Sequence, residues 1–340
     1  MKHLTSLLTA AAAAALLLAG CRPAGEPVSR SDFLLNTFVT VTLYEGGNND
    51  ILNQCIDICK DYEGIFSKTI ESSEIYRMNH RKPGETEFTL SEPCADLIGK
   101  GLYYSRLSEG AFDITIEPLS SLWDFTSGTP QIPPADQVQA AAARVDYRNL
   151  SLEGNRLTFL SPDTSIDLGS IAKGYIADRM KEYLKEQGVT SAIINLGGNV
   201  LCLGEMPDGE PFRIGLQDPS GQQNSIFANL TIHDQSVVTS GVYERHFEIN
   251  GVNYHHLLNP RTGYPYENGL VSVTIISPLS VDGDGLSTTC FSLGLTEGIR
   301  LLDTLDDTCG IFMTDDGKVH FSEGAEDYVE YLKDPESLKE

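Results

Sequence analysis

The pattern of apolar positions predicts a chain that mixes strands and helices. Residues 38–44 alternate apolar and polar side chains, as a half-buried strand does. Apolar residues then recur at helical spacing over residues 50–66. Further helices are predicted over 94–107 and, after a proline-rich loop, over 136–145.

The second half of the chain is richer in strands. Strand patterns dominate from residue 155 onward. Asn250-Gly251, between two strand-like runs, and Asp316-Gly317 each predict a hairpin turn. The helices predicted in this half cover residues 171–187, 281–293 and 296–305. Strands, helices and hairpins together favour an α+β fold, with mixed or antiparallel sheets and flanking helices, over a doubly wound parallel sheet.

The first residues have the layout of an export signal. A short basic start precedes an Ala- and Leu-rich run over residues 7–18, which is too short to span a bilayer permanently. The following Leu18-Ala19-Gly20-Cys21 resembles the lipobox of bacterial lipoproteins, and the alternative is an ordinary cleaved signal. We expect a signal peptide over 1–20 and a lipidated Cys21 with a tether over 21–31. The protein would then be exported and held by lipid at the extracytoplasmic face of the bacterial membrane.

Charge and length narrow the class of protein. The formal net charge is −24, which argues against nucleic acid or anionic lipid headgroups as partners. An acidic protein that binds a phosphorylated ligand needs local cations or a metal ion. The length fits one domain, expected over 32–325, followed by an acidic tail over 326–340.

Cysteine usage leaves two alternatives open. Apart from Cys21 there are six cysteines, an even number that permits disulfides in an exported protein. Cys55 and Cys59 lie one helical turn apart and the others lie in apolar runs, which favours buried free thiols. No C-x-x-C or Cys/His zinc spacing occurs.

The most informative stretch is Asp167-Leu-Gly-Ser-Ile-Ala-Lys-Gly174 at the start of a predicted helix. A small-residue turn that enters a helix aims backbone N–H groups at one point, where the helix dipole favours anions. Lys173 adds a positive charge there, and Asp167 places a carboxylate just outside. The spacing is neither a P-loop nor a G-x-G-x-x-G fingerprint. The stretch therefore indicates either combined phosphate and metal binding or a plain helix start.

A second stretch, residues 282–289, combines carboxylates and hydroxyls. Asp284 and Thr288 lie one turn apart, so a helix would present both on one face as hard oxygen ligands. Such ligands suit Mg²⁺ or Ca²⁺ better than zinc. The alternative is an Asp cap at the start of a helix.

A third stretch contains paired histidines. His255 and His256 precede the turn Asn259-Pro-Arg-Thr-Gly263. Neighbouring side chains on a strand face opposite sides, so one histidine is expected to point into a site. It could bind a phosphate oxygen or move a proton. The Arg261 guanidinium could bind a phosphate through two N–H groups, or it could be an ordinary surface charge.

These stretches, taken in order, resemble the ApbE family, whose members are FAD:protein FMN transferases. The resemblance covers about residues 32 to 315, and its motifs are Ser73-Glu-Ile-Tyr-Arg-Met-Asn79, Gly110-Ala-Phe-Asp113, Pro118 to Trp123, Asp167 to Gly174, Asn195-Leu-Gly-Gly198, Ser240 to Arg245, His256 to Gly263 and Asp284-Gly-Leu-Ser-Thr288. It implies a single ApbE-like, T-fold-related catalytic domain. Two positions depart from the family pattern: Leu35-Asn36 replaces Met-Gly before Thr37, and Thr69 replaces a Tyr.

The resemblance also implies a reaction. FAD would be the substrate and Mg²⁺ the metal, and FMN would pass to a Ser or Thr hydroxyl of an acceptor protein through a phosphoester while AMP leaves. The implied metal positions are Asp284, Thr288 and the backbone carbonyl of Ser170. The implied FAD contacts are Ala111, Phe112, Asp113, Asp167, Lys173 and His256. Asp284 or His256 would serve as the base.

The sequence leaves open the roles of two aromatic side chains and the choice among three activities. Phe112 and Trp123 are candidates for packing against the flavin, and Trp123 could equally be a core residue. The leading hypothesis is the FMN transferase acting on a separate membrane or exported redox protein. The alternatives are a Mg²⁺-dependent FAD pyrophosphatase that releases FMN and AMP, and a non-catalytic FAD-binding lipoprotein.

Overall fold

The computed structural model describes residues 26–125, 129–219 and 225–333. The expected signal peptide and residues 21–25 of the expected tether, Cys21 included, lie outside these residues. Within the described ranges, none of the helices combines the length and apolar character needed to cross a membrane.

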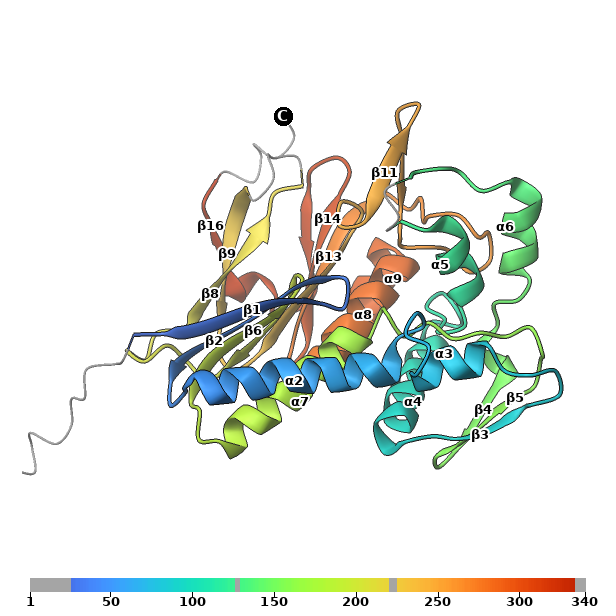
Figure 1. The fold of residues 1–340 in the computed structure, drawn as a ribbon. Helices are drawn as coiled ribbons and strands as arrows, with labels where there is room; N and C mark the ends of the chain where they lie inside the picture. Colours follow the sequence, from blue (N-terminus) through green and yellow to red (C-terminus); the bar gives the residue numbers. More distant parts are fainter. Residues whose placement is uncertain (1–25, 126–128, 220–224, 334–340) are drawn as a thin grey trace, which may run out of the picture.

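One large antiparallel sheet organises the molecule (Figure 1). The strand order is β1-β2-β6-β7-β10-β13-β14-β15, and every neighbouring pair is antiparallel. The strands are β1 (Val28–Leu34), β2 (Thr37–Glu45), β6 (Ser191–Leu196), β7 (Asn199–Leu203), β10 (Ser236–Gly241), β13 (Leu270–Ser277), β14 (Cys309–Thr314) and β15 (Val319–Phe321).

Smaller antiparallel sheets complete the β structure. The first is ordered β16-β9-β8 and the second β3-β5-β4, while β11 and β12 form a separate hairpin. Their strands are β3 (Glu87–Thr89), β4 (Leu150–Glu153), β5 (Arg156–Phe159), β8 (Phe212–Gln217), β9 (Ile226–Ile232), β11 (His246–Ile249), β12 (Val252–His255) and β16 (Val329–Tyr331).

Helices cover one face of the large sheet and extend beyond its end (Figure 1). They are α2 (Asn49–Phe66), α3 (Glu74–Asn79), α4 (Glu92–Leu107), α5 (Glu117–Trp123), α6 (Ala135–Ala142), α7 (Ala172–Glu186), α8 (Ser280–Leu293) and α9 (Leu295–Leu302). Helix α7 contacts both α2 and α8, and α8 contacts β10 and β13. This places α7 and α8 side by side beneath the middle of the sheet.

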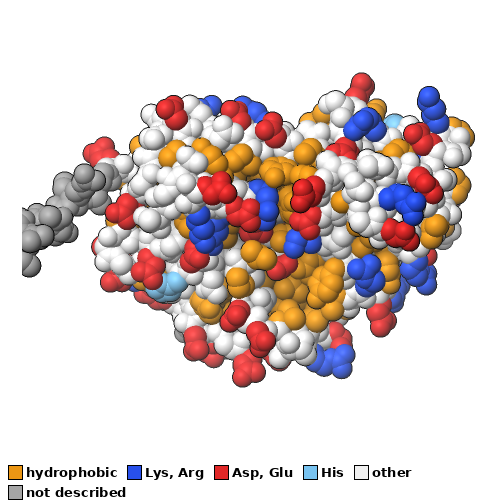
Figure 2. Space-filling view, turned by 90° about the horizontal axis from the view of Figure 1, so that it is seen from below, with side chains coloured by type: hydrophobic (Ala, Val, Ile, Leu, Met, Phe, Trp, Pro, Cys, Tyr) orange, Lys and Arg blue, Asp and Glu red, His pale blue; other side chains and the backbone are white. Residues whose placement is uncertain are grey.

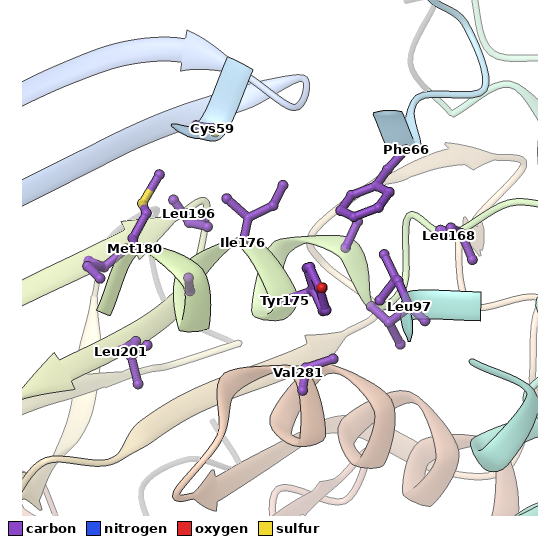
Figure 3. Packing of buried hydrophobic residues seen from close by; sticks show 14 of the residues in the cluster. Cys59, Phe66, Leu97, Leu168, Tyr175, Ile176, Met180, Leu196, Leu201 and Val281 are labelled. Atoms are coloured by element: carbon purple, nitrogen blue, oxygen red, sulfur yellow. The ribbon is translucent and has the colours of Figure 1, made fainter. Parts of the chain in front are cut away.

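The main core lies between these helices and the sheet (Figure 3). Ile176 and Met180 project from α7 toward the side on which Cys59 and Phe66 of α2 lie, whereas Val281 of α8 lies on the other side of α7. Ile176 and Met180 are fully buried. Burying a side chain of this size contributes about 1.5–3 kcal/mol, so α7 is held in place mainly by its apolar face.

A second core lies on the opposite face of the sheet. It is formed with the β16-β9-β8 sheet, whose Phe212, Leu230 and Ile232 are buried. On the side of the molecule seen in Figure 2, apolar side chains line a central hollow and charged side chains of both signs surround it. Despite the net negative charge of the chain, that side of the molecule therefore carries positive as well as negative side chains.

The structure confirms the α+β class and the main elements predicted from sequence. The strand at residues 38–44, both hairpin turns and the helices over 50–66 and 171–187 are present. The helix predicted to end at residue 145 ends at Ala142, and the one predicted to end at 305 ends at Leu302. The six described cysteines, Cys55, Cys59, Cys94, Cys202, Cys290 and Cys309, are buried free thiols.

Both ends of the fold extend past the expected domain bounds. β1 begins at Val28, inside the expected tether, and pairs with β2 along its length. Val329–Tyr331 forms β16 and pairs with β9, so the first part of the expected tail belongs to the fold. A three-residue strand is too short for an alternating pattern to reveal it. Residues 334–340 lie outside the described residues.

The close approach of α7 to α8 leads to a test of packing. A Cβ added at Gly174 would lie 2.2 Å from the Ser280 carbonyl oxygen. Gly174→Ala should lower the free energy of unfolding by about 1–3 kcal/mol, because the helices must separate. Gly64→Ala in α2 is the control, since an added Cβ there meets nothing within 4 Å and should be neutral or stabilising by up to about 1 kcal/mol. Urea unfolding followed by circular dichroism measures both, and equal effects would contradict this packing.

Candidate functional site

The start of α7 holds a carboxylate that comes from α8. The backbone N–H of Gly174 donates to Asp284 Oδ2 at 2.6 Å, and Asn199 Nδ2 donates to Asp284 Oδ1 at 3.0 Å. Asp284 is 4% exposed. The sequence left phosphate and metal binding or a plain helix start open here, and in this structure the carboxylate at the helix start is the protein's own Asp284.

Hydroxyl groups lie one helical turn further along α8. Ser240 Oγ of β10 is 2.9 Å from Ser287 Oγ and 3.3 Å from Thr288 Oγ1. Asp284 and Thr288 are four residues apart in one helix, so they occupy the same face. The alternative reading of this stretch, an Asp cap on its own helix, does not hold because the residue before α8 is Leu279.

Electrostatic effects show that three predicted residues share one neighbourhood. Burial raises the pKa of Asp284, and the positive charge of Lys173 acts in the opposite direction. Burial lowers the pKa of His256 to about 3, and the charges of Arg245, His255 and Lys173 add to this effect. His256 is therefore a neutral imidazole at physiological pH. Its buried Nδ1 makes no hydrogen bond within the described residues.

The donor set around Asp284 fits a hard cation. In the described ranges, no three or more His, Cys, Asp or Glu side chains gather as a metal site. The predicted set has a different composition: one carboxylate, the Thr288 hydroxyl and the Ser170 carbonyl. A buried carboxylate that receives one N–H on each oxygen still has free lone pairs and an uncompensated charge. Mg²⁺ commonly binds through one or two carboxylates and completes its shell with substrate phosphates and water.

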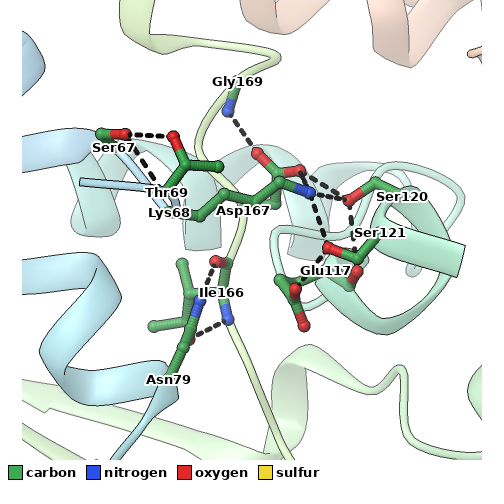
Figure 4. A network of polar contacts seen from close by, with 10 residues as sticks. All are labelled: Ser67, Lys68, Thr69, Asn79, Glu117, Ser120, Ser121, Ile166, Asp167 and Gly169. Carbon is green, nitrogen blue, oxygen red and sulfur yellow. Dashed lines mark hydrogen bonds and ion pairs between the residues drawn. The ribbon is translucent and has the colours of Figure 1, made fainter. Parts of the chain in front are cut away.

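Asp167 lies in a separate polar network just before α7 (Figure 4). Its Oδ2 is 2.9 Å from Lys68 Nζ and accepts the Ser120 hydroxyl at 2.6 Å, while Oδ1 accepts the Gly169 N–H at 2.8 Å. Burial would raise the pKa of Asp167, but Lys68, Ser120 and Gly169 together hold it below its ordinary value. Asp167 is thus an ionised carboxylate that fixes the turn leading to Ser170.

The segment Ala111–Asp113 makes its described contacts inside the protein, through both backbone and side chains. The Tyr266 hydroxyl donates to the Ala111 carbonyl at 2.9 Å. The Phe112 ring is buried and packs edge-on against Tyr104. The Asp113 carboxylate turns inward and accepts the backbone N–H groups of Thr115 and Tyr147. The Phe112 ring is therefore packed in the core, and its predicted contact with FAD stays a prediction.

Trp123 is likewise a core residue. It is 1% exposed, and its Nε1–H donates to the Gly263 carbonyl at 2.7 Å. This bond ties the end of α5 to the Asn259–Gly263 turn.

Arg261 of that turn lines two hollows of about 630 and 740 Å³. One of its Nη2–H groups donates to the Glu109 carbonyl at 3.3 Å. Arg261 is exposed, and none of its described contacts reaches Asp284.

Two residues of the site were missed on sequence grounds. Asn199 follows the Asn195–Gly198 motif and holds Asp284, and Lys68 precedes the unusual Thr69 and pairs with Asp167. The motif preceding Asn199 was a usable signal. Lys68 carries no local signal, because its partner lies 99 positions away in the sequence.

Of the paired histidines, His255 faces the interior. Its Nε2 lies 3.1 Å from the Tyr266 carbonyl and its ring packs edge-on against Phe291. Burial lowers the pKa of His255 to about 4, compared with about 6.5 in an unfolded chain. The stability that His255 contributes is therefore present above pH 6.5 and is lost as the pH falls toward 4.

This titration predicts a pH-dependent stability. Between pH 7.5 and pH 5, the wild-type chain should lose about 2 kcal/mol of unfolding free energy through His255. His255→Gln should remove that part of the pH dependence, whereas His233→Gln, at an exposed histidine, should retain it. Urea unfolding of each variant at both pH values measures the difference. An unchanged pH dependence in His255→Gln would show that His255 is not held neutral.

Fold and site together define an α+β protein in which a buried carboxylate of one helix lies at the N-terminus of another, where the charge of Lys173 acts on it and on His256. The chain belongs to the ApbE family, whose model matches residues 35–313. It is 38% identical over 288 residues to an FAD:protein FMN transferase of Klebsiella pneumoniae, covering 84% of this chain and 89% of that protein. It is 32% identical to an FAD:protein FMN transferase of Vibrio cholerae, covering 90% and 94%.

Solved structures show the same fold. The crystal structure of the ApbE protein of Thermotoga maritima superposes with a TM-score of 0.82 at 28% identity, covering 89% of this chain and 99% of that one. The flavin transferase ApbE of Vibrio cholerae superposes with a TM-score of 0.80 at 26% identity, covering 90% and 100%.

Proposed function

We propose that this protein is a Mg²⁺-dependent FAD:protein FMN transferase that attaches FMN to a Ser or Thr hydroxyl through a phosphoester and releases AMP. The observation that carries this proposal is that Asp284 accepts the Gly174 N–H at the start of α7, where the charge of Lys173 acts on both Asp284 and His256, with Thr288 one turn further along α8. Relatives that match most of this chain carry the transferase name.

FAD would be held by charge and by backbone groups. Lys173 supplies the positive charge that a pyrophosphate needs on a chain with a net charge of −24. Asp167 would supply an ionised carboxylate, and the family resemblance adds Ala111–Asp113 to the expected FAD contacts. The metal ion would be held by Asp284, Thr288 and the Ser170 carbonyl, and when bound it neutralises charge on the phosphate oxygens.

The reaction exchanges one phosphorus–oxygen bond for another. The acceptor hydroxyl oxygen forms a bond to the FMN-side phosphorus, and the bond between that phosphorus and the bridging oxygen breaks. AMP leaves with the bridging oxygen, and the hydroxyl proton passes to a base.

His256 is the better candidate for that base. Each carboxylate oxygen of Asp284 already accepts an N–H, and its remaining lone pairs are the proposed metal ligands. His256 is neutral and its Nδ1 has no hydrogen-bond partner within the described residues. A bound pyrophosphate would add negative charge near His256 and raise its pKa from about 3.

We further propose that the protein is exported and anchored by lipid on Cys21. The apolar run over 7–18 and the small residues before Cys21 support this location. A separate membrane or exported redox protein with a flavin-accepting Thr or Ser would then be the partner.

The proposal predicts a mass change in an acceptor. The full chain in detergent is mixed with FAD, Mg²⁺ and a flavin-acceptor domain that carries its target Thr, and intact-mass spectrometry follows the acceptor. The acceptor should gain one FMN, and EDTA should abolish the gain. The matched control is the same acceptor with Thr→Val at the target.

Two other results would refute the transferase. AMP and free FMN in solution with an unmodified acceptor would make the protein an FAD pyrophosphatase. Bound FAD with no product in the presence of Mg²⁺ would leave a flavin-binding protein.

The assignment of Asp284 as a metal ligand predicts what its removal does to turnover and to FAD binding. Asp284→Ala should abolish turnover while some FAD binding remains, because Lys173 and the backbone contacts stay in place. Asp306→Ala, at an exposed position after α9, is the control and should keep full activity. The initial rate of FMN transfer and FAD binding by fluorescence measure the two effects. Wild-type turnover in Asp284→Ala would refute the metal assignment.

A further inference from the structure

Asp178 places both of its carboxylate oxygens on the N-terminus of α8. It lies in the second turn of α7 and is 4% exposed. Oδ1 accepts the Ser280 N–H at 2.8 Å, and Oδ2 accepts the Val281 N–H at 2.9 Å. These are the first two residues of α8, whose N-cap Leu279 has no side chain that could accept a hydrogen bond.

The two helices therefore exchange carboxylates. Asp178 of α7 satisfies N–H groups of α8, and Asp284 of α8 satisfies the Gly174 N–H of α7. Each carboxylate also lies at the positive end of the other helix's dipole. Both sets of bonds form together only in one relative position of the two helices. That position needs glycine at 174, because a Cβ there would lie 2.2 Å from the Ser280 carbonyl oxygen.

A chain of hydrogen bonds through Ser280 and Asn199 links Asp178 to Asp284. Ser280 donates its hydroxyl to Asn199 Oδ1 at 2.8 Å, and Asn199 Nδ2 donates to Asp284 Oδ1. The Ser236 hydroxyl of β10 donates to Ser280 Oγ at 3.0 Å. Ser280, whose backbone N–H donates to Asp178, thus orients the Asn199 amide that donates to Asp284.

We propose that Asp178 is a positioning residue for the metal ligand Asp284, so that its loss weakens Mg²⁺ binding. The inference rests on the metal site of the proposed function. Asp178 itself contacts neither metal nor substrate, because both of its oxygens face α8. Groups that orient metal ligands from outside typically change metal affinity about 10- to 100-fold when removed.

The direct test is Mg²⁺ affinity in Asp178→Asn. The amide has the same shape but accepts with one atom, so one N–H of α8 is left facing an NH₂ group. Calorimetry titrates Mg²⁺ into the full chain in detergent with FAD and no acceptor. We expect the dissociation constant for Mg²⁺ to rise at least about 10-fold. The rate of FMN transfer should recover when Mg²⁺ is raised to saturation.

Asp234→Asn is the matched control for a loss of stability alone. Asp234 also holds a backbone N–H, that of Gly204, and it lies before β10, at the end away from Ser240. The Asp234→Asn substitution should lower the melting temperature of the protein and leave its Mg²⁺ affinity unchanged. If Asp178→Asn does not fold, Ser280→Ala tests the same link, because it frees Asn199 and should weaken Mg²⁺ binding several-fold.

Two results would overturn the inference. Wild-type Mg²⁺ affinity in folded Asp178→Asn, or in Ser280→Ala where that variant carries the test, would show that Asp178 serves stability alone. Absence of Mg²⁺ binding by the wild-type chain would refute the metal site of the proposed function, and the positioning role would fall with it.

Discussion

The contact between the N-termini of α7 and α8 is the constraint on which the rest of the structure depends. A helix N-terminus carries unsatisfied N–H groups and a partial positive charge, and burying it requires an acceptor. Each helix here supplies that acceptor to the other, through Asp178 and Asp284. The helices are packed against one sheet by their apolar faces, so the exchange is held in a rigid frame.

This arrangement concentrates positive potential where an acidic protein otherwise lacks it. The N-terminus of α7 and the charge of Lys173 act on Asp284, and the N-terminus of α8 lies against Asp178. The Asp284 carboxylate does not cancel both the α7 N-terminus and Lys173, which leaves a place suited to a phosphorylated ligand together with a cation. The neutral His256 lies in the same field, and its low pKa follows from burial and from the surrounding positive charges.

Local features of the site could be predicted from sequence, but the partners of its residues could not. The helix start at Asp167–Gly174 and the shared face of Asp284 and Thr288 follow from spacing, and the structure contains both. That Asp284 caps α7 could not be predicted, since it lies 110 residues from Gly174. The sequence could not decide whether Trp123 packs in the core or on a ligand, because an aromatic side chain suits both, and the structure buries it and Phe112. The family resemblance, and not the residue pattern, supplied the reaction.

The most direct test of the central claim is a crystal structure of the full chain with FAD and Mn²⁺, with the metal located by its anomalous scattering. The account predicts one strong peak within bonding distance of the Asp284 carboxylate and the Thr288 hydroxyl, with the FAD pyrophosphate beside it. A peak elsewhere, or FAD bound in the hollows beside Arg261, would contradict the placement of the reaction at the start of α7.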